Sequence, residues 1–92
     1  MLKNMKLLVL YRPNSEHATL TESYLRDFER QNPDVLVEMV DADTREGAAK
    51  AAAYAIVDYP ALIPAEDDGA PLYIWQGTAL PLMNEVASYL YS

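Results

Sequence analysis

The chain has 92 residues, 51% of them hydrophobic, and carries a formal net charge of −7 because 14 acidic residues outnumber seven basic ones. This length fits a single domain, residues 1–92, which must draw its stability from one well-packed core. The chain contains no cysteine. Thiol catalysis, disulfide bonds and cysteine-bound zinc or iron–sulfur sites are therefore excluded.

The charges are unevenly distributed along the chain. All seven Lys and Arg residues lie in the first 50 positions beside nine acids, whereas positions 51–92 hold five acids and no base. Nucleic-acid binding depends on clustered cations that neutralise phosphates, and attraction to an anionic membrane depends on polybasic segments. The charge pattern therefore argues against both classes of partner.

The first apolar run, residues 7–11, is continuously hydrophobic where a half-exposed strand would alternate. It is too short for the core of a signal sequence or for a bilayer span. We interpret residues 6–11 as a strand that is buried on both faces. The absence of a secretion signal and of cysteine leads us to expect a cytoplasmic protein.

A helix is expected next, because apolar residues recur at helical spacing over 20–28 and the helix must end before Pro33. Its start is open between a capping box at Thr19 and a cap by Asn14 or Ser15 one turn earlier.

The middle of the chain predicts a second strand and a second helix. Residues 35–40 are rich in β-branched side chains, which favour a strand. Thr44 is placed to cap a helix over residues 45–54, whose many alanines allow it to sit close to a sheet.

The last third predicts a hairpin and a helix. Strands at 61–64 and 72–76 flank a turn at Gly69, and Pro64 should end its strand or sit at a bulge. Residues 80–90 have an apolar stripe at helical spacing. The order βαβ-α-ββα predicts an α/β fold with a four-stranded mixed sheet and helices on both faces.

Three segments together resemble the thioredoxin-like superfamily, in its thioredoxin and glutaredoxin branches. Residues 54–62, YAIVDYPAL, are similar to the thioredoxin pattern Y-G-I-x-x-x-P-T-L, which ends the second helix and opens the third strand. Residues 11–18, YRPNSEHA, resemble the glutaredoxin segment that carries the C-x-x-C motif, and Gly69 and Gly77 are spaced as in the family hairpin. The resemblance covers nearly the whole chain and implies a thioredoxin-like fold.

The resemblance also implies a lost chemistry. Ser15 stands where the family has its nucleophilic cysteine and Ala18 where it has the resolving cysteine. An unassisted serine hydroxyl is neutral near pH 7, so we expect no thiol–disulfide oxidoreductase activity, no catalytic residue, no metal and no cofactor. Pro60 aligns with the family's cis-proline, which implies a cis bond after Tyr59 and backbone groups at Tyr59 that face an extended substrate.

We therefore expect a redox-inactive domain that acts as a binding or interaction module for a protein or peptide. Arg12 is the cation that could meet a carboxylate or a peptide C-terminus there. The expected binding groove is the vestigial active site, formed by Tyr11, Arg12, Asn14, Ser15, His17, Ala18, Tyr59 and Pro60.

The alternative is a glutathione-binding or glutathione-transferase-like protein in which the Ser15 hydroxyl bonds to the thiolate. Against it, no Glu/Gln-Ser pair follows residues 75–77, and no second, helical domain is present. A cap of the first helix is the favoured interpretation of Ser15. His17, the only histidine, is expected to be an exposed first-turn residue, since one His with one carboxylate is an insufficient metal site.

Seven tyrosines and one tryptophan are many for so short a chain, and aromatic residues that do not fit inside often belong to interfaces. Tyr24, Tyr54 and Trp75 are expected in or beside the core. The sequence leaves open whether the protein is a monomer or a weak homodimer. The better candidates for exposure are Tyr11, Tyr59, Tyr73, Tyr89 and Tyr91.

Overall fold

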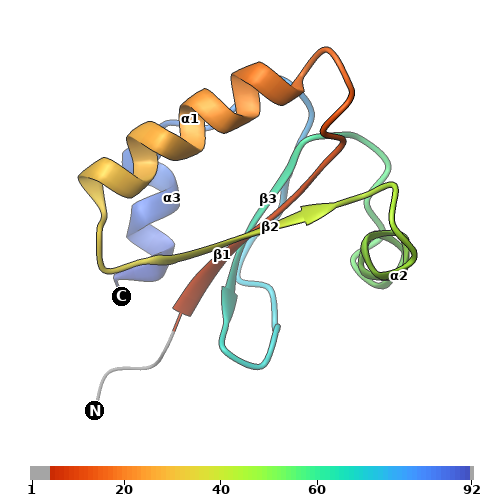
Figure 1. The fold of residues 1–92 in the computed structure, drawn as a ribbon. Helices are drawn as coiled ribbons and strands as arrows, with labels where there is room; N and C mark the ends of the chain where they lie inside the picture. The colour runs from red at the N-terminus through yellow and green to blue at the C-terminus, as the bar shows by residue number, and fades with distance from the viewer. Residues whose placement is uncertain (1–4, 92) are drawn as a thin grey trace.

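The computed structural model describes residues 5–91, which fold in the expected order around one sheet (Figure 1). The expected α/β fold is confirmed. The elements are β1 (Met5–Tyr11), α1 (Ala18–Gln31), β2 (Leu36–Asp41), α2 (Arg45–Ala53), β3 (Ala61–Glu66), β4 (Trp75–Gln76) and α3 (Met83–Leu90). No helix within this part of the chain is long and apolar enough to cross a membrane.

The strand order β2-β1-β3-β4 makes β1 an inner strand of the sheet. It pairs in parallel with β2, with Tyr11 opposite Asp41, and antiparallel with β3, with Leu10 opposite Ala61. The C-terminal ends of β1 and β2 therefore lie beside the N-terminal end of β3, at one end of the sheet. The loops that carry the predicted groove residues start or finish at that end of the sheet.

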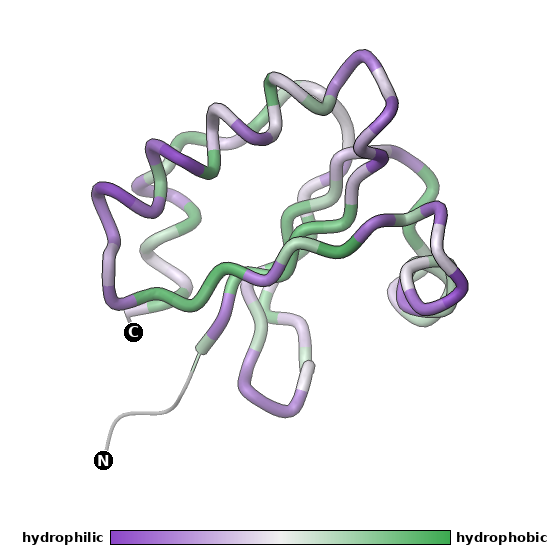
Figure 2. Tube along the Cα trace, in the orientation of Figure 1, coloured by the Kyte–Doolittle hydropathy of each residue, from purple (hydrophilic) through white to green (hydrophobic). Residues whose placement is uncertain are grey.

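Both faces of the sheet are covered, α1 and α3 lying on one side and α2 on the other (Figure 1). Leu7 and Val9 pack toward α1 and α3, whereas Leu8 and Leu10 pack toward α2. All four are at most 1% exposed. In Figure 2 the hydrophobic colour concentrates on the strands, whereas the hairpin and much of the helices are hydrophilic. This two-sided burial explains why the β1 sequence does not alternate.

Helix α1 begins without either of the expected side-chain caps. His17 occupies the N-cap position and its side chain caps nothing, whereas the hydroxyl of Ser15 donates to the carbonyl of Arg12 at 2.6 Å. The predicted capping roles of Ser15, Asn14 and Thr19 are therefore wrong. The loop before the helix forms its own hydrogen bonds, in which the Ser15 hydroxyl turns to the Arg12 carbonyl and only the Ser15 main-chain carbonyl meets a helical N–H group, that of Ala18.

Helix α2 starts as predicted and packs closely on the end of β2. Thr44 Oγ1 accepts the Gly47 N–H at 3.0 Å and donates to the Asp41 carbonyl at 2.7 Å. A Cβ on Gly47 would overlap the Asp41 carbonyl and would lie 2.9 Å from the Ala42 Cα. Glycine is therefore required at this helix–strand contact because there is no room for a side chain.

The hairpin differs from its sequence-based prediction. Pro64 does not end β3 but lies buried inside it, opposite Leu7, and the expected irregularity is found on the β4 side, where four steps from Pro71 to Trp75 face three from Leu62 to Ala65. The Pro64 carbonyl accepts from Leu72 N on the β4 side of the strand. A strand residue points its N–H and its C=O to the same side, so the missing N–H also faces that side and weakens no β1–β3 bond.

The elements after Pro64 are shorter than expected. Strand β4 pairs with β3 only at Ala61 and Leu62, and one isolated bridge joins Ala65 to Pro71. Helix α3 begins at Met83 rather than at residue 80. The segment in front of it is fixed by Tyr24, whose hydroxyl donates to the Pro81 carbonyl at 2.7 Å.

We predict that Gly47→Ala lowers the free energy of unfolding by about 1–2 kcal/mol. Overlap with fixed backbone costs about 1–3 kcal/mol, which outweighs the gain of at most about 1 kcal/mol from replacing glycine in a helix. Urea unfolding measures the change, with Ala49→Gly on the exposed side of α2 as the calibration of helix propensity. A more stable Gly47→Ala variant contradicts the close contact.

A second prediction concerns stability at alkaline pH. Burial, with a smaller contribution from the Glu85 carboxylate, raises the pKa of Tyr24 from 10.0 to about 12. The neutral phenol is thus favoured in the folded state, so this contribution to stability is complete below pH 10 and is lost as the pH rises toward 12. Urea unfolding across this interval should show a smaller fall for Tyr24→Phe than for the wild type. Parallel curves contradict the prediction.

Candidate functional site

The loop that follows β1 carries most of the predicted groove residues, and its hydrogen bonds form a closed set. The backbone N–H of Arg12 donates to His17 Nε2 at 3.1 Å, and Ser15 Oγ lies 3.0 Å from His17 Nδ1. The Ser15 hydroxyl and the Ser15 N–H both donate to the Arg12 carbonyl, at 2.6 and 3.1 Å. Arg12, Ser15 and His17 are thereby linked through main-chain atoms, the Ser15 hydroxyl and the His17 ring.

This arrangement fixes the direction of each hydrogen bond. Because Nε2 of His17 accepts the Arg12 N–H, the proton of the neutral ring lies on Nδ1. Nδ1–H then donates to Ser15 Oγ, whose own proton is directed to the Arg12 carbonyl. A serine nucleophile needs the opposite arrangement, with its hydroxyl donating to an unprotonated ring nitrogen. The Ser15–His17 pair therefore holds the loop in place and does not activate the hydroxyl.

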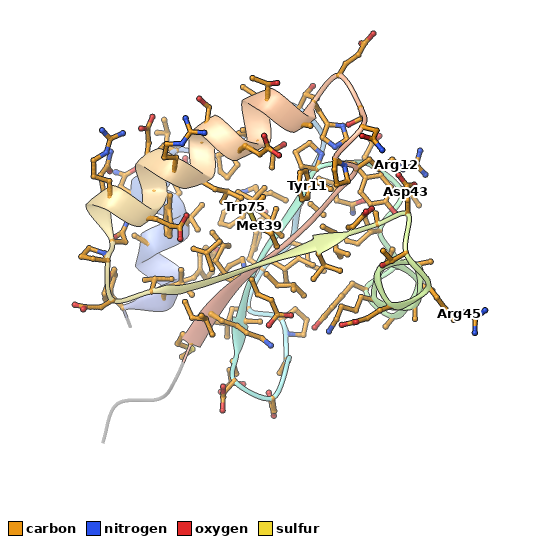
Figure 3. The ribbon with its side chains drawn as sticks, viewed as in Figure 1. Tyr11, Arg12, Met39, Asp43, Arg45 and Trp75 are labelled. Carbon is orange, nitrogen blue, oxygen red and sulfur yellow. The ribbon has the colours of Figure 1, made fainter. Side chains whose placement is uncertain are left out.

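The Arg12 side chain links the loop after β1 to the loop after β2 and to the segment before β3. Figure 3 shows Arg12 beside Asp43. Its guanidinium carbon lies 5.1 Å from the centre of the Tyr59 ring, and Nε lies 3.4 Å from the Asp43 carboxylate in the loop after β2. The Arg12 and Asp43 side chains are each about half exposed, at 53% and 54%. The charge that was expected to meet a ligand carboxylate is thus already paired with a carboxylate of the same chain.

The segment in front of β3 supplies the opposite wall. The bond between Tyr59 and Pro60 is cis, and the Pro60 carbonyl accepts the Gly77 N–H at 3.0 Å. The Gln76 side chain accepts the N–H groups of Val57 and Asp58 at 2.8 and 3.1 Å. Within residues 5–91 neither the N–H nor the C=O of Tyr59 forms a hydrogen bond. Two main-chain groups are therefore left unpaired beside the Arg12–Tyr59 pair.

Tyr11, the last residue of β1, connects the site to α1. Its hydroxyl donates to Glu22 at 3.3 Å. Burial is the largest of several effects that raise the pKa of Tyr11, and the Glu22 and Asp41 carboxylates add to it. The phenol is therefore kept as a neutral hydrogen-bond donor, which suits a structural link better than proton transfer.

The remaining predicted residues are placed as follows. Asn14 is exposed at the tip of the loop, Ala18 is buried at the start of α1, and Pro60 is buried at the base of the site. His17 is half-buried and hydrogen-bonded, so its predicted exposure is wrong, because the loop folds back over the ring. Among the described residues no group of three His, Asp or Glu is placed to hold a metal ion.

Three residues that take part in the site had no place in the sequence interpretation. Asp43 pairs with Arg12, Gln76 holds the loop before Tyr59, and Glu22 binds Tyr11. Asp43 could have been found from the sequence, because the parallel strands β1 and β2 end side by side. Arg12 follows β1 by one residue and Asp43 follows β2 by two, so the two loops start next to each other. Gln76 and Glu22 carry no such signal, since their positions depend on tertiary packing.

Comparisons with known proteins show likeness in structure and none in sequence. No protein-family model matches the chain, and no curated protein matches it. Solved structures match with high probability. Thioredoxin O2 from Arabidopsis thaliana in its oxidised state is 16% identical, with a TM-score of 0.78, over 98% of this chain and 77% of that one.

Two other solved structures agree. The thioredoxin of Fasciola hepatica is 17% identical, with a TM-score of 0.77, over 96% of this chain and 82% of that one. Oxidised mitochondrial thioredoxin 3 from Saccharomyces cerevisiae is 15% identical, with a TM-score of 0.73, over 96% of this chain and 77% of that one. Likeness at these identities concerns the fold. The chain therefore has a thioredoxin-like fold, and it has that fold without any cysteine.

Proposed function

We propose that this domain is a redox-inactive binding module that holds an extended segment of a partner protein along Tyr59. The observation that carries the proposal is the unpaired N–H and C=O of Tyr59, which stand beside a half-exposed shelf made by the Arg12 guanidinium and the Tyr59 ring. Extended peptides bind to such main-chain groups by adding one strand-like set of hydrogen bonds.

The charge of the site favours a neutral segment over an acidic one. Asp43 already pairs with Arg12 at 3.4 Å, so a ligand carboxylate would have to displace a carboxylate of the same chain. A peptide backbone needs only the two groups of Tyr59 and the apolar surface of the ring. We therefore assign the partner as an uncharged extended stretch, with Asn14 at the rim as an exposed amide.

The same contacts weaken the glutathione alternative. The Ser15 hydroxyl donates its proton to the Arg12 carbonyl at 2.6 Å, so that proton is directed away from a bound thiolate. Glutathione is also an anion, and it meets the Asp43 carboxylate at the shelf. Binding of glutathione is an outcome that the following experiment detects.

We predict that an N-acetylated, C-amidated hexapeptide of alternating threonine and valine shifts the amide signals of Arg12, Ser15 and Tyr59 in NMR titrations of the labelled protein. Arg12→Gln, which removes the cation from the Tyr59 ring, should weaken this binding about two- to fivefold. Arg45→Gln is the matched control, because Arg45 is an exposed arginine on α2 that points away from the site (Figure 3).

Three results of the titration decide between the functions. Shifts centred on Tyr59 that weaken only in Arg12→Gln support the binding module. Shifts produced by reduced glutathione at Ser15 and Tyr59, with none from the peptide, support the glutathione-binding alternative. Peptide shifts that map to another surface, or no shift at millimolar peptide, contradict the proposal.

A further inference from the structure

Three aromatic rings contact one another at the β4 edge of the sheet, far along the chain from the Arg12 loop. Tyr73 lies 4.7 Å from Trp75 and 5.4 Å from Tyr89, and Trp75 lies 5.6 Å from Tyr89, all between ring centres. Tyr73 and Trp75 come from the β4 segment and Tyr89 from α3. We call these three residues the aromatic cluster.

The cluster is anchored on its inner side and open on its outer side. Trp75 packs against the core formed by residues of β1, β3, α1 and α3, and its ring is half-buried. Tyr73 is 47% exposed and Tyr89 is half-buried. Rings that are already packed together lose little conformational freedom when a partner binds, which suits an interface.

The part of the chain that carries the aromatic cluster is acidic and contains no basic residue. No Lys or Arg occurs after Lys50. Glu85 lies four residues before Tyr89 on α3, so the two side chains share one flank of the helix. The Glu85 side chain is exposed, and its carboxylate takes part in none of the ion pairs or side-chain hydrogen bonds of residues 5–91, although it contributes to the raised pKa of Tyr24. The cluster therefore combines π faces with an uncompensated negative charge.

The same molecule shows what such a combination binds. At the Arg12 site, a tyrosine ring and a carboxylate hold one guanidinium between them, with Tyr59 at 5.1 Å and Asp43 at 3.4 Å. The aromatic cluster offers rings and the Glu85 carboxylate, and no cation of the described chain occupies them. A guanidinium suits such a site because it stacks on aromatic faces while it pairs with a carboxylate.

We propose that the aromatic cluster, together with Glu85, is a docking surface for an arginine side chain presented by a partner protein. The acidic second half of the chain attracts a basic segment from a distance, and the rings and Glu85 then hold its guanidinium. Trp, Tyr and Arg are the residues that contribute most at protein interfaces, and here the chain supplies the first two. This proposal does not depend on the binding of a segment along Tyr59, because its rings come from the β4 segment and α3.

The experiment uses Trp75 as its reporter, since it is the only tryptophan in the chain. The purified protein is titrated with a short amidated peptide that has arginine at every third position among glycine and serine. A matched peptide carries citrulline in place of each arginine, which keeps the shape and removes the charge. We expect a saturable change in Trp75 fluorescence with the arginine peptide, and binding weaker by about fivefold or more with citrulline.

Variants separate the contributions of charge and rings. Glu85→Gln should weaken binding about two- to fivefold and reduce its dependence on salt, because an exposed charge pair is lost. Tyr89→Leu should weaken it by a similar factor through the lost π face. Glu16→Gln and Tyr91→Leu, an exposed acid and an exposed ring outside the cluster, are the matched controls. Circular dichroism confirms that each variant folds.

Several results would overturn the proposal. Equal binding of the arginine and citrulline peptides excludes guanidinium recognition. Losses in Glu16→Gln or Tyr91→Leu as large as those in Glu85→Gln and Tyr89→Leu place the site elsewhere. A change in Trp75 fluorescence that follows protein concentration without any peptide, with a doubled mass in sedimentation, assigns the surface to a second copy of the chain instead.

Discussion

Pairing of β1 on both edges, with helices over both faces, is the constraint on which the rest of the structure depends. Leu7, Leu8, Val9 and Leu10 are buried between two layers of helices, so the strand cannot shift by one residue without exchanging its two faces. This fixed register brings Tyr11 opposite Asp41 and Leu10 opposite Ala61. The loops that form the candidate site begin from those positions, and their contacts follow from the register.

Hydrogen bonding differs between the two sides of the candidate site. The loop after β1 satisfies its polar side chains internally, through Arg12, Ser15 and His17, and leaves no activated hydroxyl. The segment in front of β3, in contrast, leaves hydrogen-bonding groups free. The main-chain N–H and C=O of Tyr59 are unpaired, and they lie beside the half-exposed pair of the Arg12 guanidinium and the Tyr59 ring. This difference between the two sides of the site is the basis of the binding function that we propose.

Much of the fold was predictable because it depends on local patterns. The apolar run of β1, the Thr44 cap and the helical stripes each specify one element. Predictions failed where a distant partner decides the outcome. Pro64 lies within β3 because its carbonyl meets Leu72 across the hairpin, and Ser15 caps no helix because His17 folds back on the loop. Gln76 and Glu22 join the site through tertiary contacts that the sequence does not display.

The central claim is that this chain has a thioredoxin-like fold and no thiol chemistry of its own. The Ala18 N–H donates to the Ser15 carbonyl at 3.2 Å, which closes a turn over residues 15–18. The two Cα atoms at the ends of such a turn lie within about 7 Å of each other, so cysteines at these positions could form a disulfide. The most direct test therefore compares insulin-disulfide reduction by the wild type and by a Ser15→Cys, Ala18→Cys double variant. We expect no acceleration by the wild type, and in the double variant an intramolecular disulfide that forms and exchanges with insulin. Acceleration by the wild type, or two introduced cysteines that cannot be joined, contradicts the claim.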